Sequence, residues 1–136
     1  MIRNDYFLKQ IEELGRVLGQ ALAKVLGLKN GASAGRQIDE ACQTLREETE
    51  LDIEQLLEVP LDKFVQVLQE NKAMDDANLD SFAAILFHLA ENTEDKDKAT
   101  SFYERSLVVY TYLERSSNLF SFNRNYYLEQ IREVLK

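Results

Sequence analysis

The sequence of 136 residues contains one cysteine, one histidine, one proline and no tryptophan, and these low counts limit what the protein can be. One cysteine cannot form a disulfide within the chain, and one histidine excludes any site that needs two imidazoles. No apolar run approaches the roughly 18 residues of a membrane span. Basic residues are outnumbered 16 to 24, and the resulting net charge of −8 argues against nucleic acid as the partner. We therefore expect an acidic protein of one domain, residues 1–136, without a cofactor or metal.

The first part of the chain resembles a secretion signal only superficially. Ala32-Ser33-Ala34 imitates a signal-peptidase site, and the preceding stretch is rich in Leu, Val and Ala. However, Arg16, Gln20 and Lys24 interrupt that stretch, and acidic residues occupy the segment that is basic in a signal peptide. We therefore expect a cytoplasmic protein.

The spacing of apolar residues predicts an all-α fold, a bundle of about five to six antiparallel helices that includes a long N-terminal amphipathic helix within residues 1–30. This first helix is expected to begin at the N-cap Asn4 and to end with the C-cap Lys29-Asn30-Gly31. Its apolar residues follow a seven-residue repeat. They are Phe7, Ile11, Leu14, Leu18, Ala21, Val25 and Leu28.

The body over residues 33–136 is expected to contain the other helices. One helix follows the N-cap Ser33, and a short element capped by Asp52 is broken at Pro60 before a helix over 61–69. Asn78 or Asp76 is expected to cap the next helix. Two more helices are predicted over 99–113, despite the strand propensity of 107–112, and over 123–135.

One helix pair of the body resembles the tetratricopeptide (TPR) pattern. Leu86-x-x-x-Ala90 is followed by Ala99-x-x-x-Tyr103-x-x-Ser106-Leu107, with small and aromatic residues at the expected positions. Glu94 replaces the usual turn glycine, no proline closes the unit, and no second copy follows at the expected offset of about 34 residues. The resemblance implies a TPR-like fold for the body.

A second resemblance lies at the N-terminus, in Asn4-Asp5-Tyr6-x-x-Lys9-x-Ile11-Glu12-x-Leu14-x-Arg16-x-Leu18. This motif is similar to a family of small all-helical bacterial proteins of unknown function. The resemblance implies a bacterial cytosolic protein with a TPR-like body, and it carries over no catalytic residues.

Four residues of the predicted helix over 78–92 share one face, namely Ser81, Ala84, His88 and Glu91. If the TPR analogy holds, this face is the concave surface that meets ligands. His88 is then either a partly buried or groove-lining structural residue, or a general base beside Glu91. We favour the structural interpretation.

Other chemically active residues favour structural roles as well. Cys42 falls on the apolar face of its helix and is expected to be a small core residue. Eight of the thirteen aromatic residues lie between Phe102 and Tyr127, which predicts a core seam between the last two helices. Tyr112, Phe120 and Phe122 fit that seam least well and are candidates for a contact surface.

The first helix is apolar on nearly every side. Gly15 and Gly19 add a flat face of small residues, and only a narrow polar ridge runs along its second half. Such a helix must be covered on nearly every side. The body of the chain, a second copy of it in a homodimer, or another protein could provide the cover, and the sequence leaves the three alternatives open.

The negative charge is concentrated in one stretch. Residues 37–62 carry a net charge of −8, whereas residues 1–36 carry +3. This stretch is either a solvated face or a patch that docks a basic partner, including the first helix of another copy.

These observations predict a non-catalytic helical protein–protein interaction module, not an enzyme, with a protein partner of unknown identity. Its candidate partner-binding residues are Ser81, Ala84, His88, Glu91, Gly15 and Gly19. The alternative is a small-molecule-binding or hydrolytic protein that uses His88 and Glu91 in an aromatic-lined pocket.

Overall fold

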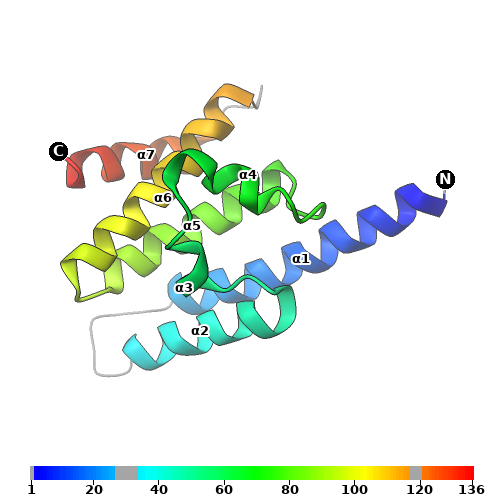
Figure 1. Ribbon diagram of the computed structural model, residues 1–136, viewed down its shortest axis with the longest axis horizontal. Coiled ribbons are helices and arrows are strands. Elements are labelled where there is room, and N and C mark those ends of the chain that lie inside the picture. The colour runs from blue at the N-terminus through cyan, green and yellow to red at the C-terminus, as the bar shows by residue number, and fades with distance from the viewer. Residues whose placement is uncertain (1, 27–33, 117–120) are drawn as a thin grey trace.

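The computed structural model describes residues 2–26, 34–116 and 121–136, and all regular structure in these ranges is helical (Figure 1). The all-α prediction is thus confirmed, but the described residues form seven α-helices rather than the expected five to six. The helices are α1 (Ile2–Leu26), α2 (Ala34–Thr49), α3 (Ile53–Leu56), the 3-10 turn η1 (Leu61–Lys63), α4 (Phe64–Leu68), α5 (Asp76–Asn92), α6 (Lys96–Ser116) and α7 (Phe122–Val134).

The long helix α1 lies beside both α2 and α5, and its N-terminal end extends away from the other helices (Figure 1). Leu14, Leu18, Ala21 and Val25 of the predicted repeat are buried, together with Val17. Burial of this stripe against α2 and α5 fixes α1 to the body, because removal of apolar surface from water is the main stabilising term in folding.

The middle of the chain is a series of short turns. Asp52 caps α3 as predicted, with its carboxylate accepting hydrogen bonds from the Glu54 and Gln55 amides. The predicted helix over 61–69 is shorter, because the chain after Pro60 first forms η1 and then α4. Pro60 has no amide hydrogen to donate, which favours such a break.

A buried arginine of α6 holds this irregular segment. The Arg105 guanidinium donates hydrogen bonds to the carbonyls of Leu56, Leu57 and Val59, and it lies 5.8 Å from the centre of the Phe64 ring. Burial lowers the pKa of this guanidinium. The carbonyl groups that the short turns leave without helical partners are thereby satisfied.

The helices α5 and α6 form the closest pair of the body, and α7 packs against both (Figure 1). The Ser106 hydroxyl donates to the Ala83 carbonyl at 2.9 Å, a close approach that a small residue permits. Tyr110 of α6 stacks on Tyr127 of α7, with ring centres 5.8 Å apart. The predicted aromatic seam between the last two helices is confirmed for Tyr110 and Tyr127, and Phe87 of α5 also joins it, whereas Tyr126 is exposed.

Several predicted helix boundaries need correction. The helix α1 begins at Ile2, two residues before the predicted N-cap Asn4. Asp75, rather than Asp76 or Asn78, caps α5 by accepting from the Asn78 amide at 2.9 Å. The predicted caps at Lys29-Asn30-Gly31 and Ser33, and the predicted roles of Leu28 and Phe120, lie outside the described residues.

Candidate functional site

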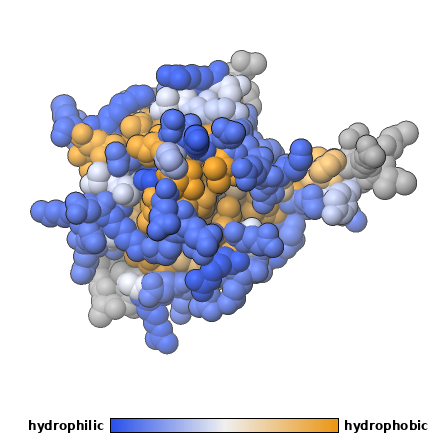
Figure 2. All heavy atoms as spheres, viewed as in Figure 1, coloured by the Kyte–Doolittle hydropathy of each residue, from blue (hydrophilic) through white to orange (hydrophobic). Residues whose placement is uncertain are grey.

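The N-terminal end of α1 projects beyond the body and carries adjacent apolar side chains. Tyr6, Phe7 and Leu8 are 60%, 42% and 54% exposed. Figure 2 shows hydrophobic atoms on this projection beside a largely hydrophilic surface. Successive helical residues are about 100° apart, so three in a row cover more than half of the helix circumference. We call Tyr6–Gln10 the α1 projection.

A groove of about 470 Å³ lies between α1 and the end of α2, and Tyr6, Lys9 and Gln10 of the projection form part of its lining. Leu14, Val17 and Ala73 provide its apolar floor, and Glu47, Glu48 and Glu50 supply carboxylates on one side. Glu50 has a φ of 62°, a left-handed conformation that ends α2 and turns the chain. We call this feature the acidic groove.

His88 lies between α5 and α7. Its Nδ1 is 2.9 Å from Glu91 Oε1, and its Nε2 is 3.1 Å from the Tyr127 hydroxyl oxygen. The side chain is only 13% exposed. A neutral imidazole can satisfy both contacts by donating from Nδ1 to the carboxylate and accepting from the phenol. This arrangement agrees with a partly buried structural histidine.

The predicted concave face of α5 is largely inaccessible. Ala84 is buried, Ser81 and His88 are partly buried, and only Glu91 is exposed. His88 lines none of four grooves that lie among the described residues. Contact of a partner with all four residues would require a rearrangement of this region.

The two glycines of α1 differ in their surroundings. A Cβ atom at Gly15 would lie 3.1 Å from the Asn78 side-chain oxygen of α5, whereas a Cβ at Gly19 would meet nothing within 4 Å. Asn78 also donates to the carbonyls of Ile11 and Ala73, at 3.1 and 2.8 Å. Gly15 therefore serves packing within the chain, and Gly19 lies on an exposed face. Gly15 is about 15 Å along α5 from His88, because Asn78, which it faces, and His88 are ten residues apart.

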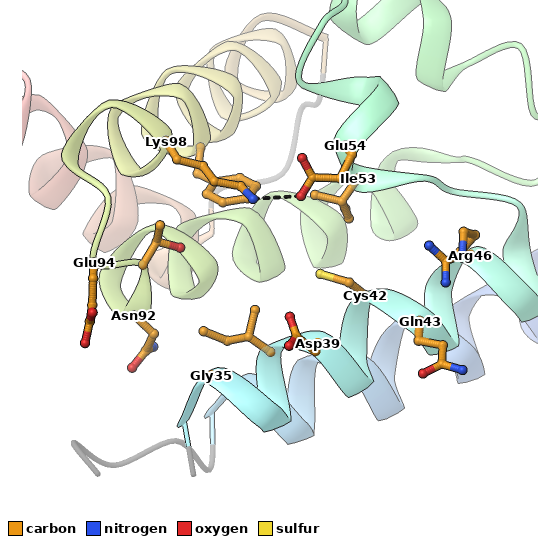
Figure 3. A pocket seen from close by; sticks show the side chains of 13 residues that line it. Gly35, Asp39, Cys42, Gln43, Arg46, Ile53, Glu54, Asn92, Glu94 and Lys98 are labelled. Carbon is orange, nitrogen blue, oxygen red and sulfur yellow. Dashed lines mark hydrogen bonds and ion pairs between the residues drawn. The ribbon is translucent and has the colours of Figure 1, made fainter. Parts of the chain in front are cut away.

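Cys42 lines a second, polar cleft of about 740 Å³, between α2, α3 and the adjoining ends of α5 and α6 (Figure 3). Its thiol packs against the core, as predicted, but is not fully enclosed. Burial, with smaller effects from Asp39 and Glu54, raises its pKa to about 11. Since the thiolate is the nucleophile, this cysteine is poorly suited to catalysis near neutral pH.

Charges of both signs surround that cleft. Lys98 and Glu54 form an ion pair at 2.7 Å across its upper side, and the Asp39 carboxylate lies on the opposite wall (Figure 3). The hydrogen bond to Glu54 raises the pKa of Lys98. Because the lining carries three carboxylates and two cations, and Lys98 already pairs with Glu54, the cleft does not select one class of charged ligand.

A buried polar pair lies in the α5–α6–α7 region. Asp80 Oδ1 and the Tyr110 hydroxyl oxygen are buried, and neither has a hydrogen-bond partner among the described residues. Burial raises the pKa of Asp80, with Arg124 opposing the rise, and burial raises the pKa of Tyr110. An unpaired buried polar atom costs folding free energy, so these groups are a local weakness rather than a source of stability.

The described residues contain no cluster of three or more His, Cys, Asp or Glu side chains suited to a metal ion. Within the same part of the chain, no helix has the length and apolar character that a membrane crossing requires. No protein-family model matches the chain, and no curated protein or solved structure matches it either. The candidate site therefore rests on its own geometry.

Sequence reasoning did not single out Tyr127 or the α1 projection. Tyr127 contacts His88 across 39 residues, and no local pattern encodes that contact. The projection could have been recognised from helix lengths, because α1 has 25 residues and its neighbours α2 and α5 have 16 and 17. At 1.5 Å per residue, these neighbours are about 12–14 Å too short to cover it.

Proposed function

We propose that the protein is a non-catalytic helical interaction module that binds a protein partner through the α1 projection. The observation that carries this proposal is the exposure of Tyr6, Phe7 and Leu8 next to one another on a helix end that no described element covers. Contiguous apolar surfaces bounded by polar residues are typical of protein interaction sites. The partner that fits best is an apolar helical or basic segment, because the acidic groove adjoins the projection.

A TPR-like body is part of the same proposal. The neighbouring helices α5 and α6 are separated only by residues 93–95, and Ser106 packs at the Ala83 carbonyl as a small residue of such a pair would. This arrangement supports the analogy for one helix pair. The bacterial and cytoplasmic setting implied by the opening sequence motif also belongs to the proposal.

The hydrolytic or small-molecule alternative has less support. Both ring nitrogens of His88 already have partners, and four grooves formed by the described residues do not include it. A general base needs access to the proton that it removes. His88→Ala gives a direct test. Loss of partner binding with unchanged stability would show that His88 has a functional rather than a structural role.

Affinity capture tests the main proposal. The tagged full chain is incubated with extract of its native cells, and retained proteins are identified by mass spectrometry. We expect Leu8→Glu to lose a protein that the unmodified chain retains. Leu26→Glu is the matched control, because Leu26 is 53% exposed at the other end of the same helix. Identical retention by all three chains would contradict the proposal.

A further inference from the structure

We propose that α7 is a detachable cover over the face of α5 that holds His88, and that it leaves this face as one unit while the other helices stay folded. In the closed state the His88 side chain is 13% exposed, and the Tyr127 hydroxyl of α7 contacts its ring. Departure of α7 would remove this contact and expose the imidazole. The covered face is separate from the α1 projection, so neither proposal depends on the other.

Few buried side chains hold α7 in place. Of its 13 residues, Arg124, Leu128 and Ile131 are buried, whereas α5 buries ten of its 17 residues. Phe122 and Tyr126 of α7 are 82% and 56% exposed. Segments with few buried apolar contacts open at a lower free energy than the core of the same protein. We therefore expect α7 to open before α5 does.

The surface beneath α7 contains polar atoms that the closed state leaves unpaired. The Tyr110 hydroxyl oxygen and Asp80 Oδ1 are buried without a hydrogen-bond partner among the described residues. Both lie next to α7, because the Tyr110 ring stacks on Tyr127 and Arg124 opposes the rise in the pKa of Asp80. Departure of α7 would let water reach these atoms, and hydration recovers the free energy that an unpaired buried polar atom costs. The closed state thus carries a penalty that the open state lacks.

Other contacts on the same surface favour the closed state. The Tyr127 hydroxyl oxygen lies 3.1 Å from His88 Nε2, and the centres of the Tyr127 and Phe87 rings are 4.7 Å apart. Leu128 and Ile131 are fully buried, so their departure would return apolar surface to water. Favourable and unfavourable contacts therefore meet beneath one helix, and a small change in either should alter its opening while the rest of the chain stays folded.

Hydrogen exchange of the full chain, followed by NMR at each amide, tests whether α7 opens as a unit. A helix of 13 residues is marginal in water on its own, so a detached α7 should lose its protection. We expect the amides of residues 127–131 to share one protection factor, at least about tenfold below that of residues 82–87 in α5. Equal protection of the two helices, or protection graded along α7 as in a fraying end, would overturn the proposal.

Three tyrosine-to-phenylalanine variants test the contacts beneath α7. Tyr110→Phe removes an unpaired hydroxyl and keeps the stacked ring, so exchange of α7 should become at least about fivefold slower. Tyr127→Phe removes a paired hydroxyl, so exchange of α7 should become about two- to tenfold faster. Tyr112→Phe is the matched control, because its hydroxyl accepts from Gln69 of α4 at 2.8 Å, and exchange of α7 should stay unchanged.

The opposite signs of the first two variants carry the test. A Tyr110→Phe chain in which α7 exchanges no more slowly than in the unmodified chain would overturn the penalty assigned to the closed state. A Tyr127→Phe chain in which α7 exchanges no faster would overturn the contact with His88 as a support of that state.

The single histidine of the chain reports whether the opening exposes the covered face. Diethyl pyrocarbonate acylates a neutral imidazole, and mass spectrometry locates the product at His88. Tyr110→Phe should slow this labelling by the same factor as the exchange of α7, and Tyr112→Phe should leave the labelling rate unchanged. One labelling rate in all these chains would show that the reagent reaches His88 while α7 is in place, and it would overturn the role of α7 as the cover.

Discussion

The two ends of α1 have similar apolar character and opposite surroundings. From Leu14 to Val25 the apolar stripe is buried against α2 and α5, whereas Tyr6, Phe7 and Leu8 remain exposed. Composition does not account for this difference, since both ends carry large apolar residues. It arises because the neighbouring helices end before α1 does. The contrast shows that apolar periodicity identifies the surface that needs cover and leaves the covering partner undefined.

Truncation of a leucine at each end should give the largest contrast. Leu18 is fully buried, so Leu18→Ala should lower the free energy of unfolding by about 2–5 kcal/mol through lost burial and a new cavity. Leu8→Ala should change it by less than about 0.5 kcal/mol, measured at concentrations where the chain is monomeric. Urea unfolding followed by circular dichroism measures both. Equal losses would show that the projection is packed in solution.

Asn78 marks the point where α1 joins the body, and its removal should have the next largest effect. Asn78→Ala leaves the Ile11 and Ala73 carbonyls without its amide, which should cost about 1–3 kcal/mol. Asn92→Ala is the control within the same helix, because among the described residues the Asn92 side chain donates only to the local His88 carbonyl. A smaller loss for Asn78→Ala than for Asn92→Ala in urea unfolding would contradict the assigned link.

The glycines should give the smallest effects and the finest comparison. Gly19→Ala should stabilise the chain by about 0.5–1 kcal/mol, because alanine is the better helix former and the added methyl meets nothing. Gly15→Ala should gain less or lose stability, since its methyl presses on Asn78, which two hydrogen bonds hold in place. Thermal unfolding of the two variants is the measurement. Equal gains in stability would mean that the Asn78 side chain can move away from the added methyl group without loss of free energy.

Local patterns predicted much of the fold. Apolar spacing located the long helices, Asp52 was recognised as a cap, and Pro60 marked the break that divides the middle of the chain. The predicted cap of α5 was wrong because Asp75, Asp76 and Asn78 are all good capping residues. The sequence does not show that the Asn78 side chain instead donates to the Ile11 carbonyl of α1.

The candidate site could be predicted only in part. The spacing of His88 and Glu91 places them on one helix face, and the structure confirms their contact. Their enclosure depends on Tyr127 and α7, which return to α5 from far along the sequence. Contacts between segments that are far apart in the sequence depend on the packing of all helices, so no single segment encodes them.

The pairing of α1 with α5 also has a consequence for synthesis. Val25 is made 67 residues before Asn92 completes α5. At about 5–20 residues per second, the ribosome needs roughly 3–13 s to supply the covering helix. During this interval α2 alone can shield the apolar stripe of α1. Until α5 is made, the nascent chain therefore exposes the side of the stripe that α5 later covers, and early encounters between neighbouring chains on one messenger RNA would involve this surface.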